Sequence, residues 1–157
     1  MVHFLIGAHA ALGEVGAIGF LWVLIELLNP TTTRVRRAKI IALISVVLLF
    51  LSWFTGGYYY VNIYGEDVKP IIKEGPQPWV HGIFMETKEH VFLFLPFLAL
   101  LNSLILKKYE KEIIKDKNIR ISVIALCVII FLLAFAIGAM GYLISSGARA
   151  ALEANLG

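Results

Sequence analysis

The fold is decided by the first apolar stretch of the chain, FLIGAHAALGEVGAIGFLWVLIELLN, which covers residues 4–29. An α-helix rises about 1.5 Å per residue, so roughly 20 apolar residues cross the ~30 Å hydrocarbon core of a bilayer. The stretch is therefore long enough to span a membrane, although it contains His9, Glu14 and several glycines. Because it is too long for a signal-peptide core and no basic segment precedes it, we expect it to remain as the first helix.

Apolar residues dominate the rest of the chain as well. Of its 157 residues, 59% are hydrophobic and 16% are charged, which is more apolar surface than a soluble domain of this size can bury. Three further stretches match the first in length and cover residues 39–61, 83–106 and 121–145. The sequence thus predicts an all-α fold, an integral membrane four-helix bundle that forms one domain over residues 1–157, with an ordered external cap at about residues 62–82.

The basic residues are divided unevenly among the connections between these stretches. Ten of the 14 lie within the first and third connections or at their edges. They are Arg34, Arg36, Arg37, Lys39, Lys107, Lys108, Lys111, Lys115, Lys117 and Arg120. The other four are Lys69, Lys73, Lys88 and Arg149. Because Lys and Arg are enriched on the cytoplasmic side of membrane spans, we expect both termini on the outer side of a cytoplasmic-type membrane. The positive net charge is then a topology signal and does not indicate nucleic-acid binding.

Two of the histidines fall at one depth of the predicted bundle. The first and third helices would run in the same direction, and the helical rise places His9 ~8 Å and His90 ~10 Å below the outer surface. An imidazole inside a membrane is costly, which makes both residues functional candidates. His3 lies at the terminus and His81 precedes Gly82, so we expect both of these to be interfacial, with no assigned role.

Glycines gather at the same level of all four predicted helices. They are Gly13, Gly16, Gly56, Gly57, Gly138 and Gly141. Glycine costs about 1 kcal/mol relative to alanine in a helix interior, so this layer indicates that another helix or a flat cofactor comes close to the backbone. Haem is such a cofactor, because its iron takes imidazoles from two facing helices. Together with His9 and His90 the glycines favour a cofactor, and Lys88 is a candidate donor to its propionates.

Two carboxyl residues of the first helix have different expected environments. Glu14 lies ~15 Å deep by the helical rise and about 140° around the helix from His9, so we do not expect the two to touch one ligand. A carboxyl group at that depth is protonated, paired or part of a proton path, and the sequence does not decide among these. Glu26 lies near the cytoplasmic end, where we expect it to pair with an arginine of the first connection.

In its four spans, its histidine pair and its glycine layer, the chain resembles the small four-helix membrane-bound b-type cytochromes. That resemblance implies one haem b ligated by His9 and His90 near the outer face. It also implies electron exchange with a quinol or quinone, or with a redox partner subunit. Many of those cytochromes hold two haems with ligands on their second and fourth helices, where this chain has no histidine, so a single haem is expected.

Two other functions fit the same residues. In a metal-ion-binding protein or transporter, the mixed imidazole and carboxylate ligands of His9, His90, Glu86 and Glu89 would bind Zn²⁺, Fe²⁺ or Mn²⁺ directly. In a structural subunit of a membrane complex, or in a homo-oligomer, the glycines would pack helices. The chain has no phosphate-binding glycine loop and no nucleophile elbow, so no motif points to hydrolysis, phosphate transfer or covalent catalysis. An electron-transfer protein and an oxidoreductase subunit both stay open.

Overall fold

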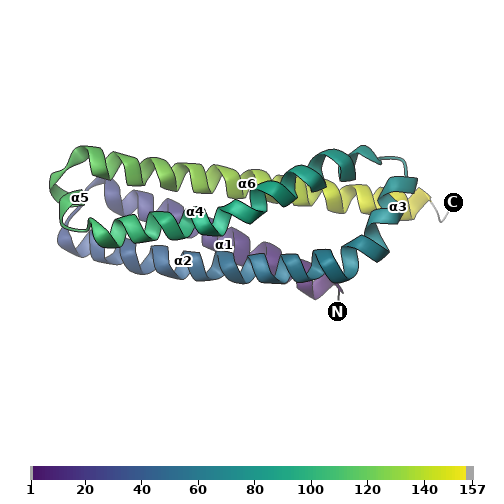
Figure 1. The fold of residues 1–157 in the computed structure, drawn as a ribbon, viewed down its shortest axis with the longest axis horizontal. Helices are drawn as coiled ribbons and strands as arrows, with labels where there is room; N and C mark the ends of the chain where they lie inside the picture. The colour runs from purple at the N-terminus through teal and green to yellow at the C-terminus, as the bar shows by residue number, and fades with distance from the viewer. Residues whose placement is uncertain (1, 155–157) are drawn as a thin grey trace.

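A computed structural model describes the backbone of residues 2–154 and the side chains of residues 4–154. Within this range the chain is helical and contains no strand. The four long helices are α1 (Val2–Leu28), α2 (Thr32–Tyr59), α4 (Glu86–Lys108) and α6 (Lys117–Ala154) (Figure 1). The short elements are the π-helical segments η1 (Tyr60–Val68) and η2 (Val80–Met85) and the helices α3 (Lys69–Glu74) and α5 (Glu112–Lys115).

Each of the four long helices is apolar and long enough to cross a membrane. Between 22% and 33% of their most apolar windows is buried inside the chain, so most apolar side chains face outward. Phe94 and Phe135, for example, are 72% and 68% exposed. Lipid accommodates such a surface, whereas water penalises it. The prediction of an all-helical chain with four potential membrane spans is confirmed.

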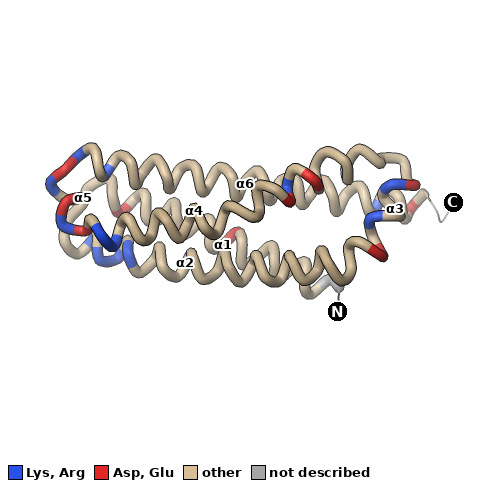
Figure 2. Tube along the Cα trace, in the orientation of Figure 1, with Lys and Arg blue, Asp and Glu red and all other residues tan. Residues whose placement is uncertain are grey.

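The long helices form an antiparallel bundle in which each one packs against two others. α1 contacts α2 and α6, and α4 contacts the same two helices, so α1 and α4 are diagonal neighbours. α1 begins and α6 ends at one end of the bundle (Figure 1). We call this the terminal end, and it also carries η1, α3 and η2. Charged residues gather at both ends (Figure 2), and we call the other one, which holds the α1–α2 turn and α5, the basic end.

The segment expected as an external cap, residues 62–82, begins and ends as a continuation of the long helices. η1 follows α2 directly, and η2 leads directly into α4. Both segments pack with α3 and the last part of α6 around a small hydrophobic cluster, which consists of Tyr64, Ile72, Val80, Met85 and Ile144. The third span therefore begins earlier than its apolar stretch at residues 83–106 indicates.

Small residues hold α1 and α2 together. A side chain added at Gly13 would lie 3.0 Å from Ser52 Oγ, and one at Gly16 would lie 3.0 Å from Leu49 Cγ and 3.2 Å from the Ser45 carbonyl. Gly19, one turn further along α1, also faces Ser45. Small residues three apart allow close approach of two membrane helices, so Gly13 and Gly16 serve helix packing.

Polar groups order the basic end. The Thr31 side chain accepts a hydrogen bond from the Arg34 N–H and caps α2. The buried Glu26 carboxylate accepts hydrogen bonds from Arg34 Nε at 2.9 Å and from Arg37 Nη2 at 3.0 Å. It also accepts one from Trp22 Nε1 at 3.2 Å. The expected pairing of Glu26 with an arginine of the first connection is confirmed.

The bundle has two hydrophobic clusters, and between them lies a level without fully buried side chains, which we call the intermediate level. The larger cluster occupies the basic half and includes Phe20, Leu49 and Ala99. The smaller one is the terminal-end cluster that contains Tyr64. Between them no side chain is fully buried on any of the four helices, over residues 4–15, 53–59, 86–94 and 138–143.

Candidate functional site

His9 lies on α1 at the intermediate level, and its imidazole is held by α2. Nδ1 is 2.9 Å from the Ser52 carbonyl oxygen and 3.0 Å from Ser52 Oγ, and that hydroxyl also lies 2.8 Å from the His9 carbonyl. A carbonyl can only accept, so Nδ1 carries the proton in this hydrogen bond and the hydroxyl donates to the His9 carbonyl. Nε2 of the neutral ring is then free to accept a hydrogen bond or bind a metal.

Two neighbours fix the plane of the His9 ring. Phe92 of α4 packs edge-on against it, with ring centroids 5.4 Å apart and planes at 76°. A side chain added at Gly56 would lie 2.6 Å from His9 Nδ1. Gly56 therefore makes room on α2 for the imidazole.

Lys88 enters the same level from α4. It lies one turn before Phe92, on the same face of the helix, and its half-buried side chain reaches α6. Its Nζ is 3.2 Å from the position of a side-chain carbon added at Gly141. The ion pairs of the described residues involve only Glu26 and Glu110 as acids, so Lys88 has no carboxylate partner there. Phe92, one turn along that face of α4, contacts the His9 ring, so Lys88 and His9 lie at neighbouring levels of the bundle.

His90 lies on the opposite side of α4. Two residues correspond to about 200° around a helix, so His90 points away from the face that carries Lys88 and Phe92. Its side chain is exposed, and Nδ1 is 2.6 Å from the Glu86 carbonyl, to which it donates. The described conformation thus does not bring His9 and His90 together, and the two imidazoles do not fit the two sides of one haem iron.

The expected glycine layer divides into three groups. Gly13 and Gly16 pack against α2, whereas Gly57 and Gly138 face open space. Gly56 and Gly141 stand against His9 and Lys88, as described above. A continuous glycine wall for a flat cofactor is therefore not formed, and two of the six glycines remain part of the candidate site.

The carboxylates near His90 do not complete a metal centre. Glu86 is exposed and Glu89 is half-buried. Among the residues that the structure describes, no group of three or more His, Cys, Asp or Glu side chains is placed to hold a metal ion. The direct metal site expected from His9, His90, Glu86 and Glu89 is not assembled in this conformation. Glu14 is exposed on α1.

The sequence did not indicate that His81 is buried. It is 2% exposed rather than interfacial, and its Nδ1 lies 2.9 Å from the hydroxyl of Tyr64, which is 1% exposed. Tyr60 stacks on Tyr64 with ring centroids 5.6 Å apart. The hydrogen bond between Tyr64 and His81 joins η1 to η2. In the sequence, the run of three tyrosines at residues 58–60 was the one signal of an aromatic cluster in this region. The His3 side chain lies outside the described residues.

A buried donor lies one turn from Gly56 on α2. The indole Nε1 of Trp53 is shielded from solvent and has no acceptor among the described residues. Its ring packs against Phe97 of α4 with centroids 6.4 Å apart. Buried polar atoms are normally hydrogen-bonded, so the vicinity of His9 and Lys88 contains both an unpaired cation and an unpaired N–H group.

Comparison with known proteins adds no assignment. No family model, no curated protein and no solved structure matches the chain. The resemblance to the b-type cytochromes therefore stays a prediction, and function is argued from the site alone.

Proposed function

We propose that the protein binds the polar head of an amphipathic small molecule, a quinone or quinol, between its membrane helices at the level of His9 and Lys88. The observation that carries this proposal is the Lys88 ammonium, which reaches Gly141 of α6 without a carboxylate partner in the described chain. A cation removed from water is costly unless it is paired. A ligand oxygen at this level would supply the missing partner.

The two side chains offer complementary chemistry to such a head group. Nε2 of His9 can accept a hydrogen bond from a quinol hydroxyl, and Lys88 can donate to a carbonyl or phenolate oxygen. Phe92 provides an aromatic edge next to them. Sites for small molecules are mostly apolar with a few placed polar groups, and the helix faces here have that composition.

The packing of the bundle supports the same location. The level between the two hydrophobic clusters lacks any fully buried side chain, and the glycines at positions 56 and 141 reduce its side-chain volume further. The apolar outer surface of the helices would leave the tail of the ligand in lipid. On the proposed topology, with both termini outside, the head group lies in the outer half of the membrane.

Fluorescence titration tests the proposal. The full-length protein in lipid nanodiscs is titrated with a short-chain ubiquinone analogue, and quenching of tryptophan emission, to which Trp53 contributes, reports binding. We expect saturable quenching, and at least tenfold weaker binding in Lys88→Met and in His9→Phe, since loss of a charged hydrogen bond costs about 1.5–3 kcal/mol.

Lys73→Met is the matched control, because Lys73 is an exposed lysine of the same end of the bundle. It should bind the analogue as the unsubstituted protein does. Non-saturable quenching, or equal binding by the Lys88 and Lys73 variants, would overturn the proposal.

Haem is a second candidate ligand, favoured by one specific observation. Nδ1 of His9 and of His90 each lies within hydrogen-bonding distance of a backbone carbonyl, which leaves both Nε2 atoms free, as in metal-bound histidines. Ligation by both would require α4 to turn His90 inward. A visible spectrum decides this: a Soret band that shifts on dithionite reduction and is lost in His9→Ala and His90→Ala would replace the quinone proposal with haem binding. A purified protein without that band excludes haem.

A further inference from the structure

A second candidate site lies at the opposite end of the molecule, where α2 begins. A groove of about 630 Å³ separates the first turns of α2 from α5 and the residues that precede it. Arg36 and Lys39 line it from α2, and Lys111 and Lys115 line it from the α5 side. The groove lies at the other end of the bundle from His9 and Lys88, so its ligand is independent of the proposed quinone site.

The groove carries a strong excess of positive charge. Its one acidic lining residue is Glu110, which forms an ion pair with Lys39. The hydrogen bond from Lys39 holds the pKa of Glu110 below its ordinary value, so this pair stays charged and neutralises only itself. Arg36, Lys111 and Lys115 have no ion pair within the described chain.

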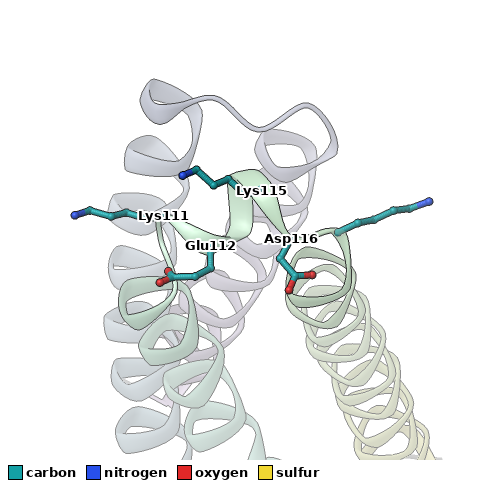
Figure 3. A pocket seen from close by; sticks show the side chains of 5 residues that line it. Lys111, Glu112, Lys115 and Asp116 are labelled. Carbon is teal, nitrogen blue, oxygen red and sulfur yellow. The ribbon is translucent and has the colours of Figure 1, made fainter.

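The nearby acids do not neutralise these three side chains. In Figure 3 the Lys111 and Lys115 side chains extend to one side, the Glu112 carboxylate lies below Lys111, and Asp116 lies apart from them. Neither acid lines the groove or forms an ion pair among the described residues. Asp116 is engaged at the start of α6, where its Oδ1 accepts hydrogen bonds from the Asn118 N–H at 2.8 Å and the Ile119 N–H at 3.3 Å. Three cations from two elements thus converge on a space that holds no free carboxylate.

An apolar stripe leaves the groove along α2. Ile40, Leu43 and Val47 follow Arg36 at helical spacing, so all four lie on one face of the helix. The three apolar side chains are 52%, 58% and 51% exposed. Charge at the end of a span, continued by an exposed apolar track, matches a phospholipid, whose phosphate sits at the interface and whose chains lie in the hydrocarbon.

We propose that this groove binds the phosphate group of an anionic phospholipid through Arg36, Lys111 and Lys115, with an acyl chain along Ile40, Leu43 and Val47. The general preference for positive charge on the cytoplasmic side accounts for the number of basic residues at this end. It does not require three of them to converge on one groove beside an apolar track. Arginine offers a planar fork for phosphate oxygens, and the two lysines add point charges.

Native mass spectrometry of the detergent-solubilised full-length protein tests the site. Phosphatidylglycerol is added, with phosphatidylcholine as the neutral-headgroup comparison, and bound lipid is counted. We expect at least tenfold weaker phosphatidylglycerol binding in the triple variant Arg36→Gln, Lys111→Gln, Lys115→Gln. Phosphatidylcholine should bind more weakly than phosphatidylglycerol to the unsubstituted protein and should not respond to the substitutions.

A control variant with the same change in charge distinguishes binding in the groove from general attraction of anionic lipid to the basic end. Lys107→Gln, Lys108→Gln and Lys117→Gln together remove three exposed charges from the same end but do not line the groove. This variant should bind phosphatidylglycerol within twofold of the unsubstituted protein. Equal loss in both triple variants, or no loss in either, would overturn the proposal.

Further arms distinguish a lipid from a soluble phosphate. Inorganic phosphate and glycerol phosphate should displace the lipid only weakly, and Ile40→Ser with Leu43→Ser should weaken lipid binding about tenfold through loss of the acyl track. Displacement by inorganic phosphate at concentrations comparable to those of the lipid would instead assign the groove to a soluble anion and overturn the proposal of a phospholipid site. The groove variants should still quench normally with the quinone analogue, so failure of one proposal is distinguishable from failure of the other.

Discussion

At the scale of single residues, the polar side chains inside the spans have different kinds of partners. Glu26 is 4% exposed and is surrounded by two arginines and an indole N–H. Nδ1 of His9 is held by Ser52, whereas Lys88 reaches Gly141 and has no carboxylate partner among the described residues. A satisfied group stabilises the fold, and an unsatisfied one is available for a ligand. This difference separates the structural acid Glu26 from the candidate site.

Replacement of Glu26 tests its structural role. Glu26→Gln keeps the size of the side chain but removes the charge that pairs with Arg34 and Arg37. Because the two arginines remain partly exposed, we expect a loss of about 2 kcal/mol in the free energy of unfolding rather than the full cost of a buried unpaired charge. Unfolding by SDS in mixed micelles measures it. Glu112→Gln, an exposed acid at the same end, should change it little, and equal effects would contradict the assignment.

At the scale of elements, the closest contact is between α1 and α2. Gly13, Gly16 and Gly19 place the backbone of α1 against Ser45, Leu49 and Ser52 of α2. The same contact brings Ser52 to His9, so the helix packing also sets the orientation of the imidazole. At the terminal end the Tyr64–His81 hydrogen bond joins η1 to η2, and η2 sets the start of the helix that carries Lys88.

A larger side chain at Gly16 tests this interface. The neighbour at 3.2 Å from an added side-chain carbon is the Ser45 backbone carbonyl, which cannot move aside as a flexible side chain would. We expect Gly16→Ile to destabilise the protein by roughly 1–3 kcal/mol through overpacking, and to weaken quinone binding through displacement of His9. Gly138→Ile is the matched control, because that glycine of α6 faces open space. If the two variants unfold at the same SDS fraction, the close contact is refuted.

At the scale of the whole molecule, the two ends have different chemistry. The basic end gathers the unpaired cations of the α2–α5 groove, and the terminal end carries the polar level and the aromatic cluster around Tyr64. A phospholipid at the first and a quinone near the second would place two ligands in opposite leaflets. The proposed orientation, with the terminal end outside, decides which leaflet each one occupies.

Cysteine labelling measures that orientation. The native Cys127 is buried, so the unsubstituted protein should react little with a membrane-impermeant maleimide. In intact cells we expect Glu153→Cys to be labelled and Lys107→Cys to be labelled only after permeabilisation, because basic connections are retained in the cytoplasm. The reverse pattern would invert the proposed topology and move the quinone site to the inner leaflet.

The sequence by itself determined the class of fold and the pairing of Glu26 with an arginine. Span length and hydropathy are local properties, so they were sufficient to predict four helices that are long and apolar enough to cross a membrane. Only the tertiary structure decided which way the side chains face. Rotation of a helix about its own axis depends on packing against its neighbours, and this packing turned Phe92 toward His9 and left His90 exposed. The same packing assigned Gly13 and Gly16 to a helix contact, because a close backbone approach is made by two helices and cannot be seen in either one alone.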